Sequence, residues 1–201
     1  MVQKRQRWQR TYSKLVLLVL LGGLLAGLTA GTLGQAQSTA PWPPEVQQWA
    51  RQVVEQLSVG IRETVFALPA ADLGEIQQRA QRVLNVLVGK QSPDYQTKAG
   101  DPLGADGIGV QAYLERLRNA IEPRAQSNDR LRPALFALNI LQAYHREALD
   151  HIKEILRVNE EGPARRNLNQ LLAFLVAARG SSEDPLSEGG ARALLIYLGG
   201  K

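Results

Sequence analysis

Residues 138–156 read LNILQAYHREALDHIKEIL, and the spacing of their apolar side chains decides the fold class. At about 100° of rotation per residue, apolar positions three or four apart fall on one face of a helix. That face carries Leu138, Leu141, His145, Leu149, Ile152 and Leu156. A helix with one apolar stripe has to bury it against other elements. Because no segment alternates with period two over more than four residues, the sequence predicts an all-α protein.

Helices are also expected in the segments on either side of this stretch. The apolar spacing and the end signals predict them over 44–68, 72–88, 110–121, 163–179 and 185–198, and the longest helix should end near residue 159. Asp72 and Glu75 have the spacing of a capping box, and Pro123 is expected to end the third helix. Short connections after residue 123 favour an antiparallel bundle of about five to six helices, formed by residues 45–198 as a single domain.

The N-terminal 36 residues have the order of an export signal. Five basic residues precede an uncharged apolar run over 15–33, and small residues follow it at Gly34 and Ala36. Cleavage after Ala36 would leave Gln37 as the new N-terminus, followed by an extended Pro-rich spacer over 37–44. The run is also about as long as the ~20 residues that span a bilayer, so retention as a membrane anchor is the alternative. Either way, we expect an extracytoplasmic protein, periplasmic, secreted or held at the membrane by residues 15–33.

The net charge of the whole chain is misleading. The 24 Lys and Arg exceed the 19 Asp and Glu by five, but residues 1–36 hold five basic residues and no acidic one. The rest of the chain therefore has 19 charges of each sign. Without a basic excess there is no evident source for phosphate-backbone binding, so nucleic acid is not an expected partner. The chain has no cysteine, which excludes disulfides and thiolate metal ligands.

The segment 90–108 has neither helical nor alternating periodicity and is rich in glycine and proline. Asp94, Asp101 and Asp106 suggest a calcium site, but the EF-hand spacing leaves one ligand in place, so we interpret them as turn formers and weak metal candidates. Such long connections are usually functional or mobile, and proteases should cut at Lys90 or Lys98 first. If the segment is rigid without metal, it becomes the best candidate for a contact surface.

The two histidines are expected to have different environments. His145 lies on the apolar stripe, which predicts a hydrogen-bonded core histidine, with metal ligation or general-base chemistry as the alternative. His151 is expected to face solvent on the opposite side of the same helix. It would share that side with Glu147, Asp150 and Glu154, a charged face paired with Arg146 and Lys153.

No catalytic motif is present, and no cofactor is expected. These observations favour a structural, accessory or protein-interaction module outside the cytoplasm, whose protein partner is unknown. The alternative is a binding protein for a metal ion or a small ligand, which would use the 94–106 loop or a bundle pocket near His145. No catalytic residue is assigned.

Overall fold

Six α-helices build the part of the chain that the computed structural model describes, residues 42–102, 107–186 and 189–200. No strand occurs among these residues, so the all-α bundle is confirmed. The helices are α2 (Pro44–Ala67), α3 (Leu73–Val88), α4 (Val110–Ser127), α5 (Arg132–Arg157), α6 (Glu161–Arg179) and α7 (Gly190–Tyr197), with single 3-10 turns at Thr97–Ala99 and Asp129–Leu131.

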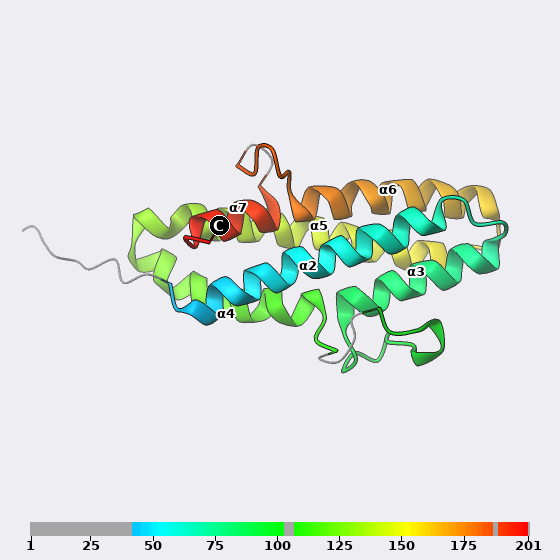
Figure 1. Ribbon diagram of the computed structural model, residues 1–201, viewed down its shortest axis with the longest axis horizontal. Helices are drawn as coiled ribbons and strands as arrows, with labels where there is room; N and C mark the ends of the chain where they lie inside the picture. The colour runs from blue at the N-terminus through cyan, green and yellow to red at the C-terminus, as the bar shows by residue number, and fades with distance from the viewer. Residues whose placement is uncertain (1–41, 103–106, 187–188, 201) are drawn as a thin grey trace, which may run out of the picture. The chain divides into compact units, whose positions relative to one another are not determined.

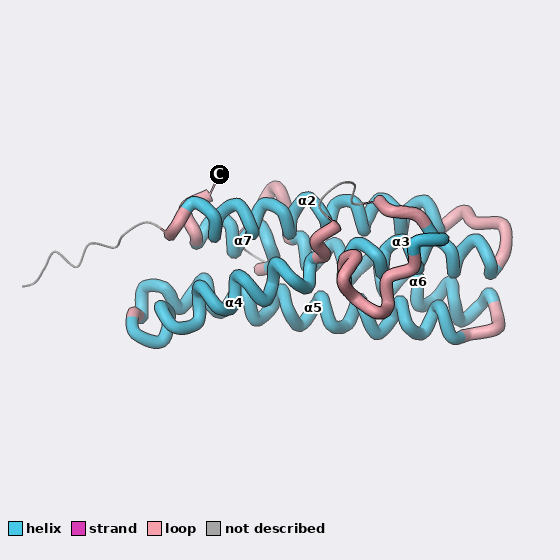
Figure 2. Tube along the Cα trace, turned by 90° about the horizontal axis from the view of Figure 1, so that it is seen from below, coloured by secondary structure: helices cyan, strands magenta, loops and turns pink. Residues whose placement is uncertain are grey.

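The helices form four antiparallel columns (Figure 1). The long helices α2 and α5 run in one direction, and each is followed by a column that returns. Helices α3 and α4 follow one another in the first returning column, and α6 and α7 follow one another in the second (Figure 2). Both returning columns are thus interrupted part of the way along the bundle.

Backbone contacts close the interruption between α3 and α4. Gly89 forms an isolated antiparallel bridge with Ile108, and the Lys90 amide donates to the Gly107 carbonyl at 2.8 Å. A Cβ on Gly109 would lie 2.3 Å from the Gly89 nitrogen, so the two chain segments approach more closely than any side chain allows. Residues 89–109, which we call the insertion, therefore leave and re-enter the bundle at one point.

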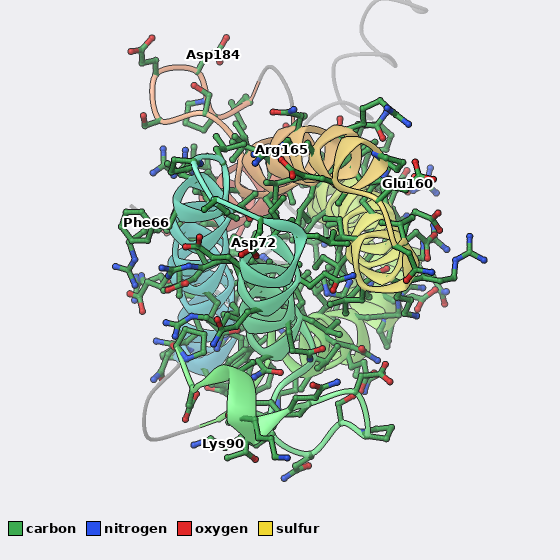
Figure 3. All side chains as sticks on the ribbon, turned by 90° about the vertical axis from the view of Figure 1, so that its right-hand side faces the viewer. Phe66, Asp72, Lys90, Glu160, Arg165 and Asp184 are labelled. Carbon is green, nitrogen blue, oxygen red and sulfur yellow. The ribbon has the colours of Figure 1, made fainter. Side chains whose placement is uncertain are left out.

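The interruption between α6 and α7 is also a close crossing of two chain segments. A Cβ on Gly190 would lie 2.6 Å from the Ala177 carbonyl oxygen, and Gly190 has a φ of +83°. Glycine is the residue that tolerates both conditions. The loop around Asp184 and the insertion around Lys90 leave the bundle on opposite sides (Figure 3).

The buried face of α5 is wider than the predicted stripe. Leu138, Leu141, His145 and Ile152 are buried as expected. Leu149 and Leu156 are only partly buried, whereas Ala148 and Ile155 are fully buried. The buried positions shift because α5 lies against helices of both returning columns (Figure 1).

Two predicted helix ends are wrong. Helix α4 does not stop at Pro123 but continues to Ser127, because Ala125 is buried in the core and Ser127 Oγ donates to the carbonyls of Pro123 and Arg124. Proline removes one helical donor, and packing on both sides outweighs that loss here. Helix α7 starts at Gly190 rather than near 185, because positive φ angles at Gly189 and Gly190 hold the crossing with α6.

The start of the bundle agrees with the predicted signals. Pro44 is the first residue of α2, and the Asp72 carboxylate accepts a bond from the Glu75 amide at 2.9 Å. Trp42 is 7% exposed and joins the core, with the Arg124 guanidinium over its ring. The predicted signal or anchor and residues 37–41 of the predicted spacer lie outside the described residues. None of the described helices is long and apolar enough to cross a membrane.

Candidate functional site

The insertion is held to α3 by one buried amide, the side chain of Asn85. Its Oδ1 accepts from the Gln96 backbone amide at 3.0 Å and from the Gln81 side chain at 3.2 Å. Its Nδ2 donates to the carbonyls of Gln96 and Gly100, both at 2.9 Å. Two accepted and two donated bonds use the full capacity of an asparagine amide. Since Asn85 is fully buried, these bonds are shielded from competing water.

Further contacts fix the same segment. Gln81 Nε2 donates to the Asp94 carbonyl at 3.0 Å, and Lys90 pairs with Asp101 at 2.6 Å. These bonds tie residues 94–101 to α3 and to the start of the insertion, and the mobility of residues 90–108 stays a prediction. Gln81 and Asn85, which sequence reasoning missed, lie four residues apart on α3 and face the insertion.

A groove runs between the fixed insertion and the C-terminal half of α5. It consists of two adjoining pockets of about 430 and 410 Å³ that share Gln81, Gln96 and Leu156. Gln77 and Gln78 complete one pocket, so four glutamine side chains line the groove. Each primary amide both donates and accepts hydrogen bonds, as a peptide backbone does.

The rim of the groove carries more positive than negative side chains. Lys98, Lys153 and Arg157 lie on it, against the single carboxylate of Asp94. Arg157 pairs with Glu154 at 2.7 Å, whereas Lys98 and Lys153 form no ion pair within the described ranges. An unpaired ammonium on the rim favours an acidic or a polar occupant over a basic one.

Of the aspartates predicted as weak metal ligands, Asp101 pairs with Lys90 and Asp94 lines the groove, where its backbone carbonyl accepts from Gln81. Asp106 lies outside the described residues. Within the described ranges, no group of three His, Asp or Glu side chains has the geometry to hold a metal ion.

His145 occupies the core position that the stripe predicts. It is 4% exposed, and its ring donates a hydrogen bond to the backbone of Leu87, near the end of α3. Burial lowers the pKa of His145 from 6.5 to about 4, and the bond to Leu87 opposes this only in part. With this pKa the imidazole is neutral near pH 7. Its Nε2 is buried without a hydrogen-bond partner, so only one of the two ring nitrogens is hydrogen-bonded.

The predicted solvent-facing position of His151 is wrong. Its Nδ1 lies 2.9 Å from the Asn167 Oδ1, and its ring stacks on Phe174 with centroids 5.3 Å apart. Both partners belong to α6, which covers a second side of α5. Glu147 and Asp150 are exposed as expected, so the charged face exists without His151.

Sequence reasoning missed the buried polar residues that position the groove. Besides Asn85, these include Glu63, which is 4% exposed and pairs with Arg82 at 2.8 Å between α2 and α3. The Arg82 guanidinium also lies under Gly100 of the insertion, 2.9 Å from where a Cβ would stand. Polar residues at positions of α3 next to its apolar stripe were the available signal. Comparison with known proteins adds nothing to this geometry, since the chain matches no family model, no curated protein and no solved structure.

Proposed function

We propose that the protein is an interaction module on the outer side of a membrane, and that the groove beside the insertion binds an extended segment of a partner protein. The observation that carries this proposal is the fixation of the insertion by Asn85. A long connection that is bonded in this way to a buried side chain forms a preorganised surface, which lowers the ordering cost of binding.

The chemistry of the groove supports an extended, acidic segment as the partner. Four glutamine amides can pair with the backbone groups of an extended chain, and Leu156 offers one apolar contact. The unpaired Lys98 and Lys153 favour acidic side chains in that chain. The proposed location rests on the basic, apolar and small residues of the first 36 positions.

Site-specific photo-crosslinking in the native cell tests the proposal. A photoreactive residue at Gln78, exposed beside the groove, should give a discrete protein adduct. The same residue at Gln126 is the matched control, because Gln126 is an exposed glutamine in the last turn of α4, away from the insertion. The adduct from position 78 should weaken when Lys98→Glu and Lys153→Glu reverse the charge of the rim.

A second variant connects the adduct to the fixed insertion. Asn85→Ala removes three bonds to the insertion and one to Gln81, and Asn85 is not itself a lining residue of the groove. We expect it to abolish the adduct from position 78. Equal adducts from positions 78 and 126, or an adduct that survives Asn85→Ala at full yield, would show that the groove is not the contact surface.

A further inference from the structure

The crossing of α6 and α7 brings two arginines together. Arg179 is the last residue of α6, and Arg192 lies in the first turn of α7. A Cβ on Gly180 would stand 3.5 Å from the Cβ of Arg192 and 3.7 Å from its backbone nitrogen. The two side chains therefore start beside each other, although the loop 181–189 separates them in the sequence.

Neither guanidinium has a counter-charge among the residues that the structure describes. Arg179 Nε and Arg192 Nη1 are shielded from solvent and have no hydrogen-bond partner, and neither residue forms an ion pair in the described part of the chain. Other partly buried arginines of this protein are paired, Arg82 with Glu63 at 2.8 Å and Arg165 with Glu161 at 2.6 Å. A shielded N–H group without an acceptor loses its bonds to water and gains nothing in return.

The surroundings add to the positive potential. The pKa of Arg179 is lowered, mainly by burial and to a smaller extent by the positive charge of Arg192. The first turn of α7 has no acidic residue and no side-chain cap, and a cation in the first turn opposes the helix dipole. The pair is thus held together against electrostatic repulsion by the glycine crossing.

We propose that Arg179 and Arg192 bind a phosphate group. Guanidinium forks match the oxygens of a phosphate, and a group with close to two negative charges compensates both arginines, whereas a carboxylate would leave one positive charge. The shielded Nε and Nη1 atoms are the donors that such a group would satisfy. The phosphate is either free inorganic phosphate or the monoester headgroup of a lipid.

Thermal unfolding of the full-length chain in a neutral detergent tests the site. Inorganic phosphate should raise the Tm relative to chloride at equal ionic strength, because a ligand of the native state stabilises it. Arg179→Gln and Arg192→Gln should each raise the Kd for phosphate at least tenfold, about the effect of losing one charged hydrogen bond. Arg116→Gln, which removes one exposed charge on α4, is the control and should leave the Kd unchanged.

Two readouts separate binding from a structural role. Without phosphate, Arg192→Gln should not lower the Tm, because it relieves the repulsion between the two guanidinium groups. Arg192→Lys keeps the positive charge but should still weaken phosphate binding, because an ammonium lacks the guanidinium fork. Short-chain phosphatidic acid, with short-chain phosphatidylcholine as its control, distinguishes the sources: a shift with this lipid and none with inorganic phosphate assigns the lipid headgroup. The proposal is overturned if neither probe shifts the Tm, or if the shift persists unchanged in both glutamine variants.

Discussion

The environment of a polar side chain inside this bundle depends on its contacts with neighbouring helices. His145 and His151 lie six positions apart on α5, and both contact other helices, His145 buried and His151 partly buried. His145 donates to the end of α3, while His151 stacks on α6. The two histidines therefore make different predictions for stability.

His145 should make folding stability depend on pH. Its pKa is lowered to about 4 in the folded protein against 6.5 in the unfolded chain, so the unfolded state binds more protons between these values. Stability is then complete above about pH 6.5 and is lost as the pH falls to about 4, by about 3 kcal/mol in total. Urea unfolding across this range should show the slope. His145→Gln should flatten that component, and an unchanged pH profile in the variant would contradict the assignment.

Removing either histidine should destabilise the protein. His145→Ala leaves a cavity and an unpaired group at the end of α3, at a cost of roughly 1 to 4 kcal/mol. His151→Ala loses the stacking on Phe174 and the contact with Asn167, at about 1 to 2 kcal/mol, more than the roughly 0.5 kcal/mol typical of a solvent-facing side chain. Chemical denaturation measures both, and Glu147→Ala on the exposed face is the control, expected within about 0.5 kcal/mol of the parent.

At the scale of the elements, side chains from other helices donate hydrogen bonds to the carbonyls at the ends of several helices. The last carbonyls of a helix have no partner within it. Here Arg165 donates to the carbonyls of Leu68 and Ala70 after α2, and Gln77 donates to the Val158 carbonyl after α5. Gln47 donates to the Leu198 carbonyl after α7 at 3.0 Å. Because each bond joins residues distant in the sequence, it fixes the helix ends relative to one another as well as capping them.

The insertion depends on α3 in the same way, through Asn85. Asn85→Ala should cost about 2 to 4 kcal/mol in local stability, because three bonds to the insertion and one to Gln81 disappear. Tryptic cleavage at Lys98 should then accelerate by about tenfold or more, since a drop of 1.4 kcal/mol in opening free energy is tenfold in population. The control is Asn169→Ala, whose exposed side chain bonds only to the Arg165 carbonyl of its own helix. Equal cleavage rates in the two variants would show that Asn85 does not hold the insertion.

For the whole molecule, the prediction concerns the N-terminus of the form found in the cell. The Gly34 and Ala36 pattern predicts cleavage before Gln37. Intact-mass measurement on the native soluble and membrane fractions should show a species that starts at Gln37. A full-length species confined to membranes would instead establish residues 15–33 as an anchor, and the groove and the arginine pair would then work beside a bilayer.

The sequence by itself determined the helical class, the antiparallel order and most helix boundaries. These follow from apolar spacing and from capping residues such as Asp72, which act within a few neighbouring positions. The missed ends at Pro123 and near residue 185 show the limit of local signals. Tertiary packing carries α4 past its proline, and a glycine crossing delays the start of α7.

Only the tertiary structure decided the two candidate sites. Asn85 of α3 bonds to Gln96 of the insertion, eleven positions later in the chain. Arg179 and Arg192 lie close together although a loop separates them in the sequence. His151 faces α6 because a helix in a bundle has more than one neighbour, which a single apolar stripe does not reveal. Such contacts depend on which surfaces meet after folding, whereas periodicity reports only what each segment would bury on its own.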